Sequence, residues 1–415
     1  MNGDDSMDGF HRGWCVLLAC CAASLLLSGC WSRNEINDIA VVTAIGIDKQ
    51  KDQYTVSLQV PISRLLGPAI SGGGTNTKLV SDAARTISET GATIMEAYRK
   101  IQQKVPREIY FTHSRIIIFG QELAQSGILP VMDFFERYRQ PQLASYILVT
   151  KGKALDVLSY KPKIESLDGH QFREELTNGS VLAVHAKDFM NALMNDGIEP
   201  SAGQVEVISG YNRRKKETTG QNLDLPDEKT TIAMLGTAVF KDDKLVGWLD
   251  DEETRGLLWI KNEVKSGSVI TVAVPETEGG GTISAQLNAC KTKVTPNIGG
   301  DEPSLGLRIN SGVEIYENNS RLDLSDPRTV EKVEKMMEAA ALSRIGEVLD
   351  KVQKEWRADI FGFGDAFYRK YPKVWNQELK KQWDDRFPYL PVRITVQVKV
   401  VGTGLSNKSY RDGFK

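Results

Sequence analysis

The chain has 415 residues, with 52 Lys and Arg against 54 Asp and Glu, and a formal net charge of −2 at pH 7. A polypeptide this close to neutral lacks the basic excess that a phosphate backbone attracts, so we expect no nucleic acid among its partners. Its length predicts two or three domains.

An apolar run at residues 16–27, broken only by Ser24, precedes a cysteine. A run of about a dozen residues is shorter than the roughly 20 that a membrane-spanning helix needs, and it predicts the core of a secretory signal peptide over residues 1–29. The end of this run fits a lipobox, in which small residues come before a cysteine that receives a diacylglycerol: Leu27, Ser28, Gly29 and Cys30. We therefore expect a covalent lipid on Cys30, such as palmitate-containing diacylglycerol, and a mature chain that begins there.

Two alternatives to the lipobox are an ordinary signal peptide and a buried helix with an incidental cysteine. The start of the chain is unusual for an export signal, because it carries three aspartates against the single Arg12; a start at Met7 would remove two of them. From Cys30 onward, 51 basic and 51 acidic residues balance, and Cys290 is the single other cysteine. The mature chain thus has no cysteine pair for an internal disulfide or a cysteine-rich metal site, and we expect no cofactor besides the lipid.

Residues 39–160 predict a mixed α/β N-terminal domain that follows a tether at 30–38. Alternating apolar residues on both sides of the polar turn 48–53 predict a β-hairpin. The apolar spacing of 78–105 predicts two short helices or one kinked helix, with the break near Gly91. A strand, helix and strand are then predicted over 114–150.

The next segment, 161–231, has weaker patterns and is predicted to be a small middle domain with a polar linker. It contains two short helical patterns, at 166–178 and 185–197, and a strand pattern at 203–211. The basic cluster at 212–217 lies in the polar stretch that ends this segment, and we interpret it as a solvated loop.

Residues 232–402 predict an α+β C-terminal domain, with a polar tail at 403–415. A hairpin at 231–250 and strands at 268–274, 283–294 and 306–318 are followed by a capping Asp326 and Pro327. From there to Gly362 the pattern predicts a helix of about 35 residues, with Lys351 on its outer side. A last strand is predicted at 392–400. The apolar stripe of the helix comprises Val330, Val333, Met337, Ala341, Ile345, Val348, Val352, Trp356 and Ile360. The fold class is therefore a multidomain α+β protein, in which a long helix packs on the C-terminal sheet.

No catalytic arrangement emerges from the residue pattern. The three histidines after Cys30 are scattered, and His113 and Ser114 are adjacent on a predicted strand, where neighbours face opposite ways. The glycines of 361–367 follow a helix and lack the third glycine of a dinucleotide loop. The acidic stretches 196–203 and 250–253 lack calcium-loop spacing. We expect no enzymatic activity and no metal site.

Three long stretches resemble the Ger(x)C family, the lipoprotein C subunits of nutrient germinant receptors in bacterial spores. They are GCWSRNEINDIAVVTAIGIDK at 29–49, LGTAVFKDDKLVGWLDDEETRGLLW at 235–259 and LDKVQKEWRADIFGFGDAFYRKYPKVW at 349–375. The resemblance implies a non-enzymatic receptor subunit on the outer face of the spore inner membrane, in contact with membrane lipid and with integral membrane A and B subunits. The alternative is a solute-binding lipoprotein that captures a small nutrient for a permease. That class has two similar lobes, whereas this pattern predicts two unlike domains.

Overall fold

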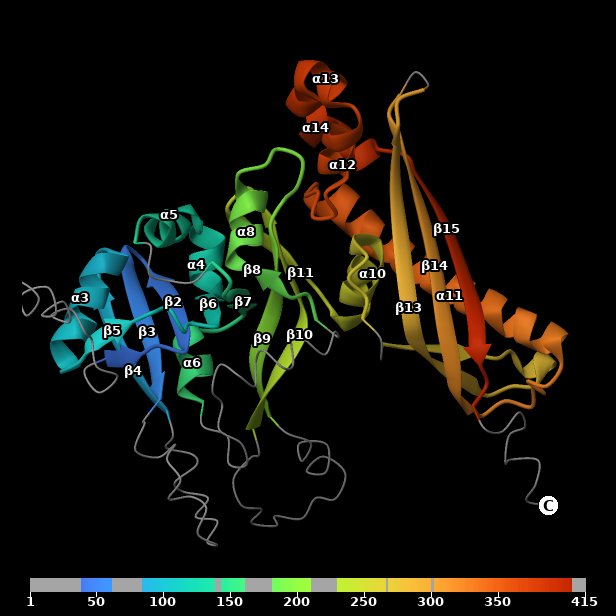
Figure 1. Ribbon diagram of the computed structural model, residues 1–415, viewed down its shortest axis with the longest axis horizontal. Helices are drawn as coiled ribbons and strands as arrows, with labels where there is room; N and C mark the ends of the chain where they lie inside the picture. The colour runs from blue at the N-terminus through green and yellow to red at the C-terminus, as the bar shows by residue number, and fades with distance from the viewer. Residues whose placement is uncertain are drawn as a thin grey trace, which may run out of the picture.

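The computed structural model describes residues 39–61, 84–138, 143–160, 181–209, 230–265, 268–299 and 302–404. Within these residues two large sheets lie beside each other, and α10 (Asp251–Lys261) lies between them (Figure 1). A separate small sheet pairs β1 (Ile39–Val41) with β5 (Glu108–Tyr110). The predicted combination of a mixed α/β N-terminal part with a C-terminal sheet and long helix is confirmed.

The first large sheet has a parallel centre and antiparallel ends, in the order β11-β10-β9-β7-β6-β2-β3-β4, with β8 paired to β7. Every residue of the central strand β6 is buried, as expected for a parallel strand that is covered on both faces. The strands are β2 (Ala44–Gln50), β3 (Gln53–Pro61), β4 (Ala84–Gly91), β6 (Ile116–Gly120), β7 (Tyr146–Thr150), β8 (Val184–His185), β9 (Ser201–Ser209), β10 (Thr230–Lys241) and β11 (Lys244–Leu249).

Helices cover both faces of this sheet. One face packs against four helices, α3 (Ile94–Lys104), α4 (Gln121–Ser126), α5 (Leu129–Arg137) and α8 (Ala186–Leu193), and the other against α6 (Ala154–Ser159). The buried carboxylate of Asp48 on β2 fixes α6, because it accepts hydrogen bonds from the first N–H groups of that helix, at Ala154 (2.8 Å) and Leu155 (3.0 Å).

The helix predicted over 78–105 is wrong for residues 84–91, which form β4. Hydroxyl groups bridge β3 and β4, with Thr55 and Thr90 3.1 Å apart and Ser57 and Ser88 3.0 Å apart. Cross-strand pairing decides this segment because its serines and threonines have no strong helical preference. The helix begins only at Ile94, after the N-cap of Thr93.

The structure also corrects the grouping of residues 181–249. β9 pairs with β7 in parallel and β10 pairs with β9, so both the predicted middle segment and the 231–250 hairpin extend the first sheet. Phe240 of β10 packs edge-on against Phe189 of α8, with ring centroids 5.4 Å apart. Periodicity identified these strands, but a strand's partner depends on apolar neighbours that lie far away in the sequence. Residues 210–229, with the basic cluster, and the 166–178 helical pattern lie outside the described residues.

The C-terminal sheet has the order β12-β13-β14-β15, with β15 parallel to β14. Its strands are β12 (Val269–Ala273), β13 (Thr282–Asn297), β14 (Ser304–Asn318) and β15 (Val392–Gly402). One face packs on α10, on α11 (Pro327–Asp350) and on α12 (Phe363–Lys370), α13 (Pro372–Val374) and α14 (Lys380–Arg386). In Figure 1, α11 passes behind the sheet, α10 lies beside β13, and α12, α13 and α14 lie near the upper end of the sheet.

The long helix follows its predicted stripe but ends earlier than Gly362. Asp326 caps α11, which continues into a π-helical turn over Lys351–Trp356 and stops at the left-handed Arg357 (φ 53°). The stripe is buried at Val333, Met337, Ala341, Ile345, Val348 and Val352. The outward position predicted for Lys351 is wrong: its Nζ lies 2.7 Å from Glu253 Oε1 of α10.

We expect Val348→Asp to destabilise the protein by several kcal/mol, because it places an unpaired charge at a fully buried position between α11 and the C-terminal core. Ala339→Asp is the matched control, since Ala339 is exposed on the same helix. Thermal unfolding followed by circular dichroism measures both variants. Equal melting temperatures would contradict this assignment of the buried face.

Candidate functional site

The predicted lipidation site, Cys30, and the lipobox residues Leu27, Ser28 and Gly29 lie outside the described residues. The expected lipid on Cys30 therefore stays a prediction. The described chain begins at Ile39, with β1.

His113 and Ser114 do not form a nucleophile and base pair. They lie in the loop before β6 and not on the strand predicted there, with His113 exposed and Ser114 fully buried. Among the described residues the Ser114 hydroxyl has no hydrogen-bond partner, and the Ser114 carbonyl accepts from the Ser145 hydroxyl at 2.8 Å. His185 stacks on Tyr146, with ring centroids 4.2 Å apart, whereas His113 lies beside Tyr110, with ring centroids 6.5 Å apart.

Within the described part of the chain, no helix is both long and apolar enough to cross a bilayer. The same residues contain no group of three or more His, Cys, Asp or Glu side chains placed to hold a metal ion.

The two sheets meet where two glycine-containing segments touch. Gly197, in the loop after α8, and Gly364, at the start of α12, pack backbone to backbone: a Cβ added to Gly364 would lie 2.7 Å from the Cα of Gly197. The N–H of Asp365 donates to the carbonyl of Gly197 (2.9 Å), and the N–H of Glu199 donates to the carbonyl of Asp359 (2.8 Å). We call the contact of residues 195–200 with 359–365 the junction.

Asp359 is the buried polar centre of the junction. Its carboxylate accepts hydrogen bonds from the N–H groups of Phe363 (3.1 Å) and Gly364 (2.8 Å) and from the indole N–H of Trp383 (3.1 Å). No cation is among these partners. Burial raises the pKa of Asp359 to about 6, because loss of hydration outweighs the donors that favour the charged form.

Ion pairs flank the junction at its rim. Lys241 of β10 bonds Glu199 at 2.7 Å and also pairs with Asp384 of α14. Lys380 of α14 lies 2.6 Å from Asp196. Exposed pairs add little stability, but these bridge the two parts of the chain and so favour one relative orientation.

A second contact between the sheets involves β11, α10 and α11. Gly247 of β11 lies against the indole of Trp356, where an added Cβ would come within 2.3 Å of the ring. The Lys351 ammonium sits 5.0 Å from the centre of the same ring while it pairs with Glu253. Such a partly buried cation beside an aromatic face and a carboxylate is a stabilising arrangement.

The residue pattern does not predict the junction. It suggests a solvated loop at 196–203 and a helix stop at 361–367, and the structure brings these two stretches together. Gly197 and Gly364 are the available signal, because glycine permits close approach by another backbone. Nothing in either stretch identifies the other as its partner.

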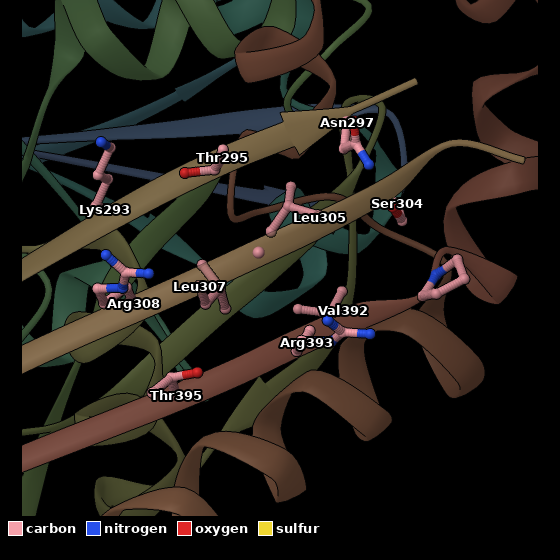
Figure 2. Close-up of a pocket in the computed structure, with 12 residues that line it drawn as sticks. Lys293, Thr295, Asn297, Ser304, Leu305, Leu307, Arg308, Val392, Arg393 and Thr395 are labelled. Carbon is pink, nitrogen blue, oxygen red and sulfur yellow. The ribbon is translucent and has the colours of Figure 1, made fainter. Parts of the chain in front are cut away.

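The face of the C-terminal sheet opposite α10 and α11 is uncovered and cationic. We call it the open face; on it a shallow hollow of about 900 Å³ extends over β13, β14 and β15. Figure 2 shows Lys293, Arg308 and Arg393 on these three adjacent strands, with Thr295 near Lys293 on β13 and Thr395 near Arg393 on β15. Register places Lys293, Arg308 and Thr395 in one row and Thr295, Gly306 and Arg393 in the next.

We expect Gly364→Ala to cost about 1–3 kcal/mol, because its methyl group would overlap Gly197 and the Trp375 ring, both within 2.7 Å. Gly346→Ala, on α11 with no atom within 4 Å, should instead stabilise by up to about 1 kcal/mol through helix propensity. Urea unfolding of both variants measures the contrast. A gain of stability in both would show that the junction is not tightly packed.

Asp359 predicts a pH dependence of stability. Its pKa of about 6 in the folded protein lies above the ordinary aspartate pKa of 3.8, so the unfolded chain loses this proton first as pH rises. The free energy of unfolding therefore falls as pH rises from about 4 to about 6. The difference between the two pKa values corresponds to a loss of up to about 3 kcal/mol. The Asn side chain of Asp359→Asn does not titrate, so this variant should not lose stability for this reason. As pH rises from about 4 to 6, the free energy of unfolding of the wild type should therefore fall relative to that of the variant. A difference that is constant with pH would contradict the shift.

Curated relatives match almost the whole chain. Spore germination protein KC of Bacillus subtilis (strain 168) is 28% identical over 94% of this chain and 96% of its own length. Putative spore germination protein YfkR of the same organism is 30% identical over 93% of this chain and 95% of its own length, and spore germination protein B3 is 22% identical over 92% and 96%.

The family models and a solved structure agree with these relatives. Residues 32–207 match the model of the spore germination protein N-terminal domain, and residues 235–404 match the model described as spore germination B3/GerAC like, C-terminal. The crystal structure of the GerBC protein is 18% identical and aligns with a TM-score of 0.50 over 86% of this chain and 96% of that one, which supports the fold. The chain belongs to the Ger(x)C family of spore germination proteins.

Proposed function

We propose that this protein is a lipid-anchored, non-enzymatic subunit of a spore nutrient germinant receptor. A diacylglyceryl group on Cys30 would hold it on the outer face of the spore inner membrane, where it docks on integral membrane A and B subunits. The observation that carries this proposal is the whole-length similarity to spore germination proteins. The match to the N-terminal domain model starts at residue 32, two residues after Cys30.

The length of the tether favours close approach to the membrane. Residues 31–38 are eight residues, which span at most about 3.6 Å each, so β1 begins within roughly 30 Å of a lipid on Cys30. The first sheet would then lie next to the membrane subunits. One acyl-bearing cysteine holds a protein less firmly than a spanning helix does, so docking on those subunits would add to retention.

A solute-binding lipoprotein is less well supported. That class captures its ligand between two similar lobes, whereas the two sheets here differ in strand order and in helical cover.

Cys30→Ala should abolish acylation without unfolding the described domains, since Cys30 precedes their first strand. Metabolic labelling with a palmitate analogue should mark wild type and not the variant. In spores that depend on this gene, the variant should also lose membrane retention and slow nutrient germination, while Cys290→Ala serves as the matched control. Label on the variant would overturn the lipid assignment. Normal germination without the gene would overturn the receptor role.

A further inference from the structure

The open face carries four cations that no described carboxylate neutralises. Lys291, Lys293, Arg308 and Arg393 are exposed, and none forms an ion pair within the described residues. In a chain of near-zero net charge this local excess attracts an anionic partner. No Asp or Glu occurs in the strand segments concerned, 291–297, 304–312 and 391–397.

The edge strand of the C-terminal sheet, β15, is protected from pairing with another strand along only its second half. Because the N–H of Leu305 donates to the carbonyl of Pro391, even-numbered residues of β15 point their backbone groups away from β14. Near the end of β15, two glutamates of α11 accept these outward groups: Glu338 from Val398 (3.2 Å) and Glu334 from Val400 (2.9 Å). Such covering prevents pairing with another strand.

The first half of β15 has no such cover. The outward N–H groups of Ile394 and Val396 have no acceptor among the residues that the structure describes. On the helix side, the side chains of Val392, Ile394 and Val396 are only partly buried, whereas Val398 is fully buried beneath α11. On this stretch the outward backbone donors have no acceptor within the described residues, and the apolar side chains pack on the core but stay partly exposed.

We propose that this stretch, 392–396, binds an extended segment of a partner protein, which adds a strand to the C-terminal sheet and carries acidic residues on the open face. Alternate residues of an added strand point to opposite sides, so acidic side chains would face Arg393 and, one strand further in, Arg308. The intervening apolar side chains would cover Val392, Ile394 and Val396. This docking surface lies on the C-terminal sheet and is additional to the proposed contact of the first sheet with the membrane subunits.

A polypeptide fits these observations better than an anionic bilayer does. A planar lipid surface would contact the cations, but it would not cover outward N–H groups that lie in the plane of the sheet. The hollow is also concave, with Gly306 on its floor, where an added Cβ would meet no atom closer than 3.8 Å.

Fluorescence anisotropy with the full-length chain in detergent tests the proposal. The probe is a fluorescein-labelled ten-residue peptide in which glutamate alternates with valine. We expect saturable binding that weakens with salt, and charge reversal should weaken it in order of distance: about tenfold for Arg393→Glu, less for Arg308→Glu and least for Lys291→Glu. Lys244→Glu, an exposed cation on the other sheet, should leave binding unchanged.

Two comparisons isolate the backbone contribution. Ile394→Pro removes an outward N–H without breaking a bond to β14, and it should weaken binding more than Ile394→Ala, which keeps that N–H. A probe with N-methyl groups on alternate residues should bind about tenfold more weakly than the unmodified probe. Thermal unfolding of each variant confirms that it is folded.

Absence of saturable binding would overturn the proposal. So would equal binding of the N-methylated probe, or equal affinity of Ile394→Pro and Ile394→Ala. If phosphatidylglycerol vesicles bind through the same cations while the backbone changes have no effect, the open face is a lipid surface and the proposal is wrong. The assay measures peptide binding alone. Absence of peptide binding would therefore leave the receptor role standing, and loss of the receptor role would leave the peptide-binding proposal standing.

Discussion

The arrangement of the whole molecule depends on one backbone contact, between Gly197 after α8 and Gly364 at the start of α12. Two backbone segments approach this closely only where neither residue carries a Cβ. Beside this contact the Asp359 carboxylate accepts from the N–H of Gly364, and the Asp359 carbonyl accepts from the N–H of Glu199. The close backbone approach and these directional bonds together favour one packing of the two sheets.

That packing leaves the C-terminal sheet with two very different faces. The inner face shares a continuous apolar core with α10 and α11, and this core reaches Val239 and Leu249 of the first sheet. The opposite face is polar, cationic and open. A sheet covered on one side in this way is stable, yet it presents both a broad surface and an edge to other molecules. The glutamates of α11 protect part of that edge, which makes the remaining part the accessible one.

Membership of the Ger(x)C family connects the chain with spore germination. Within the described residues the two sheets are joined at two places, the junction and the contact of Gly247 with the Trp356 ring. Close-packed contacts of this kind deform little, so the two sheets are expected to move as one body.

The sequence by itself determined most elements of the C-terminal half: the capped helix at Asp326, its buried stripe and the alternating strand at 392–400, because each is encoded in residues only a few positions apart. The predicted lipobox at Cys30 is likewise a local pattern, and the family resemblance rests on three local stretches, at 29–49, 235–259 and 349–375. Only the tertiary structure decided that 84–91 is a strand, that 231–250 joins the first sheet, and that Lys351 turns inward to Glu253. These outcomes depend on partners about twenty to a hundred residues away. The periodicity of a side chain shows that it is buried or exposed without showing what covers it.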